Sequence, residues 1–222
     1  MTTAYAYTDS TLVKQELGAS VAFNNTTSPS ITQVTTWITE ESAHINLIGG
    51  RTFGSTDYNE VIDYSGEDLI QTENAPIISV NSLLYSTSEL GSSGYALADT
   101  KTEGTHYTVY NDSGEIAVIW NNWSPSVGRK RMQVNYTAGY STVPYTVQKL
   151  ATKMVAKRAI DQIIENGANE GNIGGSISVG SISIVEPANL GLNSYRELTK
   201  DIDSLKKELV SGFGVYRYKL RY

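Results

Sequence analysis

Two histidines are the imidazole groups that could carry acid–base chemistry in this chain. His44 stands in a stretch with helical spacing, beside apolar neighbours, and His106 opens a stretch with strand-like alternation, next to Glu103. Proton transfer, or a Ser-His-Asp arrangement, needs an imidazole that a second group orients. A packed or hydrogen-bonded role explains each histidine better, so we expect no catalytic residue.

Three carboxylates, those of Asp57, Glu60 and Asp63, are close enough in sequence to suggest a metal site. Calcium loops, however, combine paired acids with a glycine at a fixed position, and this segment has neither feature. The chain has no cysteine, which excludes a disulfide framework, a thiolate zinc site and a cysteine nucleophile. We therefore expect a solvent-exposed acidic loop here, and no metal or cofactor.

One dense basic run interrupts the body of the chain. Arg129, Lys130 and Arg131 follow a turn at 125–128. Basic side chains on an edge strand prevent sheet-to-sheet aggregation, whereas a basic loop can bind a polyanion or an acidic partner. The residues alone leave both interpretations open.

The last residues, 213–222, alternate cations with tyrosines and aliphatic side chains. A period of two is that of a β-strand, and an isolated strand needs an outside sheet edge for its backbone groups. Gly212 and Gly214 offer a hinge. We expect a docking tail whose contact residues are Val215, Tyr216, Arg217, Tyr218, Lys219, Leu220, Arg221 and Tyr222.

Composition narrows the class of protein. The 222 residues include 17 Lys and Arg against 23 Asp and Glu, a net charge of -6. An acidic chain does not suit a general nucleic-acid coat, which needs cations to neutralise phosphates. No apolar run approaches the roughly 20 residues that span a bilayer, and the first residues lack a signal-peptide pattern. We expect a soluble protein made inside the cell.

The spacing of apolar residues predicts four helices, which could position the histidines, carboxylates and cations described above. Proline in the first turn supports the starts of the second and third helices, and a capping box supports the start of the fourth. The third is apolar over more than half of its circumference, which is typical of a helix at the centre of a bundle. The predicted helices span 8–18, 28–48, 144–166 and 194–212.

Between the second and third helices, the spacing of the apolar residues changes from a helical period to a period of two. The tetrapeptide Asn111-Asp112-Ser113-Gly114 predicts a hairpin turn between two short strands. Near Gly180, a three-residue step between apolar positions predicts a bulge within a strand. A loop is expected at 91–104. The predicted strands span 77–85, 107–110, 116–120, 131–137 and 177–184.

Segregated elements in this order predict an α+β fold. It consists of a helical bundle of about four helices with an inserted antiparallel β-rich block and an extended C-terminal tail. Gly139 and Pro144 form the turn from strand to helix, and we expect a backbone conformation at Gly139 that other residues resist. The expected parts are an N-terminal helical part at 1–75, a β-rich insertion at 76–140, C-terminal helices at 141–212 with a strand near 177–185, and the docking tail at 213–222.

Several short segments follow one another in a specific order. The most distinctive is a strand, Met132 to Tyr140, that ends in Tyr-Thr-Ala-Gly-Tyr and is followed by Val143-Pro144 and a long apolar helix. The others are 45–53, at the end of the second helix, 75–83 and 177–184. Together they resemble the head–tail connector, or adaptor, proteins of tailed phages over most of residues 8–212. The segments 54–70 and 86–105 and the tail lie outside the resemblance.

The resemblance implies a structural virion protein without catalytic activity, cofactor or metal. Such a protein forms a ring of about twelve copies beneath the portal protein, meets the stopper or tail-completion protein, and extends the channel through which viral DNA passes without sequence-specific binding. It implies a place in the neck between capsid and tail, assembly in the host cytoplasm, and no membrane. Arg129, Lys130 and Arg131 are then candidates for contact with DNA or a neighbouring subunit, and the tail for contact with the portal.

Two other classes remain open from the residues. Trp120 and Trp123 near the predicted hairpin, among three tryptophans and fifteen tyrosines, fit a carbohydrate-binding module, although such modules are mostly all-β. A small serine hydrolase using His44 or His106 is the other alternative.

Overall fold

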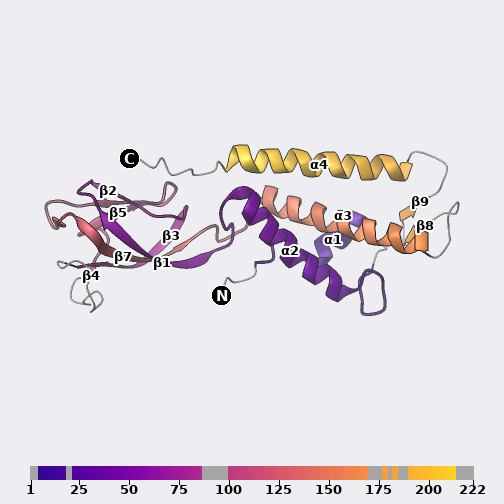
Figure 1. Cartoon of the computed structure of the whole chain (residues 1–222), viewed down its shortest axis with the longest axis horizontal. Coiled ribbons are helices and arrows are strands. Elements are labelled where there is room, and N and C mark those ends of the chain that lie inside the picture. The colour runs from indigo at the N-terminus through magenta and orange to yellow at the C-terminus, as the bar shows by residue number, and fades with distance from the viewer. Residues whose placement is uncertain are drawn as a thin grey trace. The chain divides into compact units, whose positions relative to one another are not determined.

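The computed structural model describes residues 5–18, 22–86, 100–169, 177–179, 182–184 and 190–213. The chain divides into two compact units (Figure 1). The helical unit comprises residues 1–51 and 143–222, and the β unit comprises residues 52–142. Within the described ranges, the helical unit contains four helices and the β unit contains antiparallel sheets, which confirms the predicted α+β fold.

Helix α3 is the centre of the helical unit, as its wide apolar surface predicts. It contacts each of the other three helices, and α4 lies alongside it (Figure 1). Four aliphatic side chains on α1 and α2 pack against the small residues Ala156 and Ala159 of α3, which allow the helices to approach closely. The helices are α1 Ser10–Leu17, α2 Ile31–Gly49, α3 Tyr145–Asn169 and α4 Leu190–Gly212.

Side-chain caps fix the starts of the first two helices. The Asp9 carboxylate accepts hydrogen bonds from the backbone N–H groups of Thr11 and Leu12, at 2.7 and 2.9 Å. Ser30 and Gln33 form a reciprocal capping box at the start of α2. Pro29 therefore precedes the cap, whereas the sequence predicts it inside the first turn. Ser30 displaces the start because its hydroxyl accepts from the Gln33 N–H.

The β unit contains two antiparallel sheets around one apolar core. The core includes Tyr136 and Met132 from the larger sheet and Ile116 from the smaller sheet, all fully buried. The larger sheet has the order β1-β7-β3-β4 and the smaller the order β2-β6-β5. The strands are β1 Thr56–Tyr64, β2 Leu69–Gln71, β3 Ile77–Tyr85, β4 Thr100–Lys101, β5 Tyr107–Tyr110, β6 Glu115–Val118 and β7 Gly128–Ala138.

The acidic segment predicted as a loop is strand β1, so that prediction is wrong. β1 is nine residues long and pairs antiparallel with β7. Its side chains alternate between exposed and half-buried, with Asp57 and Asp63 on the exposed face and Glu60 on the other. Because β1 and β2 belong to the β unit, this unit begins at residue 52, whereas the predicted insertion begins at 76.

Two predictions near the C-terminus are corrected. β8 Ile177–Val179 and β9 Ile182–Ile184 form an antiparallel pair in which Ile177 lies opposite Ile184, so the segment is not one bulged strand. α4 begins at Leu190, so the predicted capping box at 194–197 lies inside the helix. Residues 91–99 of the predicted loop and residues 214–222 of the predicted tail lie outside the described residues.

Candidate interaction surfaces

The turn after β7 depends on Gly139. Its φ angle is 108°, in the region that favours glycine, as expected from the sequence. A Cβ atom there would lie 2.2 Å from the carbonyl oxygen of Gly54. The Tyr140 N–H donates to the Phe53 carbonyl at 3.1 Å, and the two rings stack. Gly139 thus lets the strand that leaves the β unit lie against the strand that enters it.

The two histidines have local structural partners. The Nδ1 atom of His44 lies 3.3 Å from a carboxylate oxygen of Glu41, three residues earlier on α2. The Nδ1 atom of His106 accepts the backbone N–H of Thr102 at 3.0 Å. Neither of these partners is a serine hydroxyl, which a Ser-His-Asp arrangement would place beside the imidazole. Both contacts fit the packed, hydrogen-bonded roles expected from the sequence.

The exposed face of β1 and β7, which we call the outer face, is polar. Cross-strand hydrogen bonds link its side chains in pairs. Thr137 donates to Asp57 at 2.6 Å, and Gln133 donates to Asn59 at 2.8 Å. Asn135 donates to Ser82 on β3 at 2.8 Å. These bonds join the side chains of β1, β7 and β3 across the sheet.

The opposite face of β1 carries a polar network at the edge of the core. The hydroxyl of Tyr136 donates to the carboxylate of Glu60, which also accepts from the side-chain amide of Asn74 at 3.2 Å and from the Glu73 N–H at 3.0 Å. Burial, with the hydrogen bond to Glu60, raises the pKa of Tyr136. The network explains how an acidic residue can occupy an inward position of a strand.

The basic run lies in an irregularity of β7. Ile62 pairs with Met132 and Tyr64 with Gly128, so three residues of β7 stand opposite Asp63 alone. The Asp63 carboxylate accepts the Lys130 N–H at 2.7 Å, and Lys130 has a φ of 48°. The exposed residues Arg129 and Lys130 project from this bulge, whereas half-buried Arg131 donates to the Ser86 carbonyl at 3.3 Å. The structure thus separates the predicted basic triplet into two surface cations and one that braces the sheet.

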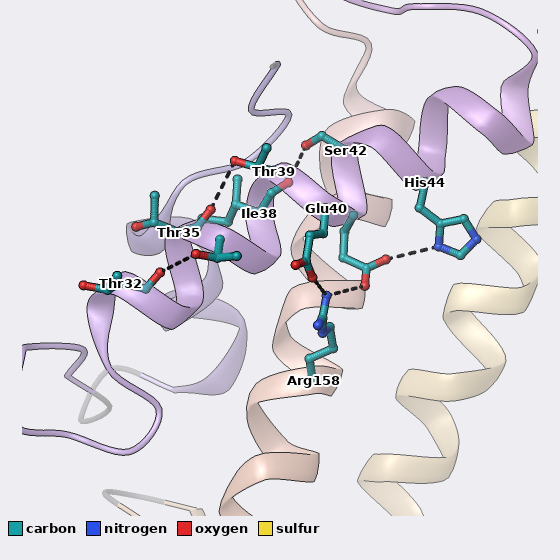
Figure 2. A network of polar contacts seen from close by, with 10 residues as sticks. Thr32, Thr35, Ile38, Thr39, Glu40, Ser42, His44 and Arg158 are labelled. Carbon is teal, nitrogen blue, oxygen red and sulfur yellow. Dashed lines mark hydrogen bonds and ion pairs between the residues drawn. The ribbon is translucent and has the colours of Figure 1, made fainter. Parts of the chain in front are cut away.

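Helices α2 and α3 are joined by a polar network (Figure 2). Arg158 of α3 donates to the carboxylates of Glu40 and Glu41 at 2.6 and 3.2 Å, and Glu41 also meets His44. The guanidinium of Arg158 lies 5.2 Å from the ring centroid of Trp37, a cation–π contact. The network thus ties α2 to α3 through Arg158.

Lys153 joins three helices. It lies on α3 with its side chain only 10% exposed, and its ammonium meets Glu16 of α1 at 2.6 Å and Asp201 of α4 at 3.1 Å. Burial alone lowers the pKa of Lys153, but hydrogen bonds and charge attraction from the two carboxylates outweigh it, so the pKa is raised. The lysine therefore stays charged at neutral pH and fixes α1 and α4 against α3.

Neither a metal cluster nor a membrane span was found in the part of the chain that the structure describes. No three His, Asp or Glu side chains there are grouped so as to hold an ion. No helix in those ranges has the length and apolar character to cross a bilayer.

Sequence reasoning missed the edge strand β1 and the Glu60 network. A signal for β1 was present, since Tyr58, Ile62 and Tyr64 alternate with polar residues. The partners of Glu60, in contrast, lie more than ten residues away in sequence and are visible only in the fold.

Comparisons with known proteins do not show a family for this chain. No protein-family model matches the sequence, and no curated protein matches it. Among solved structures, the chain is similar to one from the neck of an empty GTA particle computed with C6 symmetry, with a TM-score of 0.48 and 14% identity. The match covers 70% of this chain and 77% of that chain. A likeness of this degree is too small to transfer a function.

Proposed function

We propose that this chain is a structural protein of the head–tail connector of a tailed-phage particle. It forms a ring between the portal protein and the stopper or tail-completion protein and extends the DNA channel. In this role it has no catalytic activity, cofactor or metal. The ring has about twelve copies and belongs to the virion neck, and assembly takes place in the host cytoplasm without a membrane.

The strand-to-helix turn supports this proposal most strongly. The Tyr-Thr-Ala-Gly-Tyr segment at 136–140, which resembles the connector family, ends β7, and the helix predicted from Pro144 is α3. At its centre, Gly139 approaches the Gly54 backbone at the point where the β unit is inserted into the helical unit. The most distinctive segment of the resemblance thus leads from the β unit back into the helical unit.

The outer face of the β unit suits a channel wall. Its hydroxyl and amide groups bond one another across the strands, and two of its side chains, Asp57 and Asp63, are acidic. DNA that must slide past such a surface binds it weakly, because non-specific DNA affinity comes from released counterions around cations. Arg129 and Lys130, on the bulge of β7, are the cations that could reach DNA or a neighbouring subunit.

The alternative of a carbohydrate-binding module loses support in the structure. Such a site needs aromatic rings presented to solvent together. Trp123 is 7% exposed and packs edge-on against Tyr85, whereas Trp120 is 40% exposed with its indole N–H donating to Asp68. The serine-hydrolase alternative loses support because, within the described residues, no serine hydroxyl contacts either histidine: His44 meets Glu41, and His106 accepts a backbone N–H.

Mixing the full chain with the portal protein of the same virus and imaging the product by electron microscopy tests the proposal. We expect rings of this chain attached to one end of the portal. The proposal would be contradicted if the images showed portals without rings even when the chain is in large excess over the portal protein. A glycan array is the matching test for the carbohydrate alternative, and we expect no binding on it.

A further inference from the structure

Strand β1 is the edge strand of the larger sheet. Within the described residues it pairs with one strand, β7, so the backbone groups of every second residue point away from the sheet along its other side. We call this side the open edge of β1, and it extends from Asp57 to Tyr64. Long edge strands of this kind are templates for an added strand.

The two faces beside the open edge differ in chemistry. On the outer face, Asp57, Asn59, Val61 and Asp63 are exposed, with Val61 at 47%. On the inner face, Tyr58 and Ile62 are half-buried and pack against the core of the β unit. A strand that added here would therefore need cations on one face and apolar side chains on the other.

The tail has this pattern in its sequence. Its cations, Arg217, Lys219 and Arg221, occupy alternate positions, and Tyr216, Tyr218, Leu220 and Tyr222 occupy the positions between them. The segment 215–222 contains three cations and no acidic side chain, whereas β1 contains the three acids Asp57, Glu60 and Asp63 and no cation. At about 3.3 Å per residue, the two strands have nearly equal lengths.

We propose that residues 215–222 of one copy add as a strand to the open edge of β1 in a second copy. The cations then lie on the outer face near Asp57 and Asp63, and the tyrosines and Leu220 extend the core beside Tyr58 and Ile62. Both carboxylates already accept one hydrogen bond, from Thr137 and from the Lys130 N–H, and each keeps acceptor sites for a cation. Arg129 and Lys130 lie close to Asp63 and partly offset its charge, so Asp57 attracts the cations of the tail more strongly.

This contact would be heterologous, because the donor tail and the acceptor edge are different surfaces. Repeated contacts of that kind close into a ring when the rotation between copies closes. The inference rests on the proposed function in one respect, since it assumes that copies of this chain assemble side by side. Beyond the proposed function, the inference names the open edge of β1 as the surface of a second copy with which the tail pairs.

Cross-linking between copies tests the contact, and the cysteine-free chain makes the result unambiguous. One full-length variant carries Val61→Cys, near the middle of β1, and another carries Lys219→Cys. We mix them with a short thiol-reactive linker, which tolerates a register shift of two residues. The matched control replaces Val61→Cys by Thr108→Cys, an exposed position on β5 of the other sheet. We expect dimers linked through residues 61 and 219 at least fivefold above the control.

Charge-neutral variants test the ionic part. Asp57→Asn with Asp63→Asn keeps the hydrogen-bond acceptors and removes two charges, and should lower the yield of the 61–219 cross-link about 3- to 10-fold at low salt. Glu67→Gln with Asp203→Asn removes two exposed charges elsewhere and should leave the yield unchanged. Equal yields from the two pairs of variants would overturn the assigned role of the carboxylates.

Electron microscopy of the same samples separates this inference from the proposed function. Rings without the 61–219 cross-link would overturn the inference and leave the connector function standing. Cross-linked chains that never close into rings would support the inference and count against a ring function. A double Val61→Cys, Lys219→Cys variant that links only within single chains, or a cross-link no stronger than the Thr108→Cys control, would also overturn it.

Discussion

Single residues decide how each unit is held together. Gly139 is the clearest case, because both its φ angle and the Gly54 carbonyl exclude a side chain. Lys153 is another, since it replaces apolar packing at the meeting point of three helices by two ion pairs. A lysine buried this deeply is tolerated only with partners, so its carboxylates are part of the fold.

We expect Gly139→Ala to destabilise the β unit by about 2–4 kcal/mol, because the new methyl group collides with the Gly54 backbone in an unfavourable φ region. Urea unfolding followed by tryptophan fluorescence, to which buried Trp123 of the β unit contributes, measures the change. Gly212→Ala, at a position where a Cβ meets nothing within 4 Å, is the control and should alter stability by less than about 1 kcal/mol. Equal effects of the two substitutions would contradict this account of Gly139.

We expect Lys153→Met to lower the free energy of unfolding by about 1–3 kcal/mol at pH 8, because Glu16 and Asp201 lose their partner. Since the pKa of Lys153 is raised in the folded state, its stabilising contribution is complete below the unfolded value near 10.5 and is lost as the pH rises through the folded value. The difference between wild type and variant should therefore shrink above about pH 10.5.

Urea titrations of both proteins at pH 8 and pH 11 measure this difference directly. Lys207→Met, at an exposed position of α4, controls for the loss of a positive charge and should have little effect at either pH. If the difference in the free energy of unfolding between wild type and Lys153→Met were the same at pH 8 and pH 11, the ion pairs of Lys153 would contribute nothing to stability.

At the scale of elements, the bulge of β7 presents two cations on an otherwise acidic chain. Asp63 holds the bulge through the Lys130 N–H, which accounts for a lysine with a φ of 48°. The bulge thereby points Arg129 and Lys130 away from the sheet, while Arg131 stays bonded to Ser86. Bulges often redirect side chains in this way.

Arg129→Glu with Lys130→Glu should change the free energy of unfolding by less than about 0.5 kcal/mol, because both side chains are exposed. In contrast, particle yield or DNA retention should fall several-fold. Arg131→Glu should destabilise the sheet itself, since it breaks the bond to Ser86. Wild-type infectivity of the double variant would exclude the two surface cations from assembly and from contact with DNA.

The tail is a separate element by its sequence. Deleting residues 214–222 should leave the helical unit intact, because the Phe213 N–H closes α4 on the Leu209 carbonyl and remains. Attachment to portals and to neighbouring copies should weaken at least tenfold, measured by co-sedimentation with portals. A variant with the last nine residues permuted, so that cations and tyrosines no longer alternate, is the matched control and should fail as the deletion does. Undiminished attachment of the deleted chain would refute the docking role.

How far the sequence predicts these elements depends on where their partners lie. α2, α3, β3 and β7 were predicted because their apolar residues repeat locally with one period. β1 was missed although Tyr58, Ile62 and Tyr64 alternate with polar residues, because Glu60 interrupts that alternation. The residues that stabilise Glu60 there, Tyr136 and Asn74, come from distant segments. The start of α4 was misplaced for a simpler reason. An existing helix extends cheaply by one turn, so the Ser-x-x-Glu pattern at 194–197 does not stop it.

At the scale of the whole molecule, the chain combines a helical unit with a β unit inserted between α2 and α3. The order of segments that resembles the connector family runs through both units. The polar outer face, the acidic edge of β1 and the basic tail sequence supply the different surfaces that a ring with heterologous contacts requires. The central claim is that copies of this chain occupy the neck of a tailed particle.

Cryo-electron microscopy of the neck of the mature particle tests that claim most directly. The account predicts a ring directly beneath the portal whose repeating density is fitted by copies of the helical unit and the β unit, with side-chain density matching α3 and β7. A neck in which other proteins account for all density between portal and tail would contradict it.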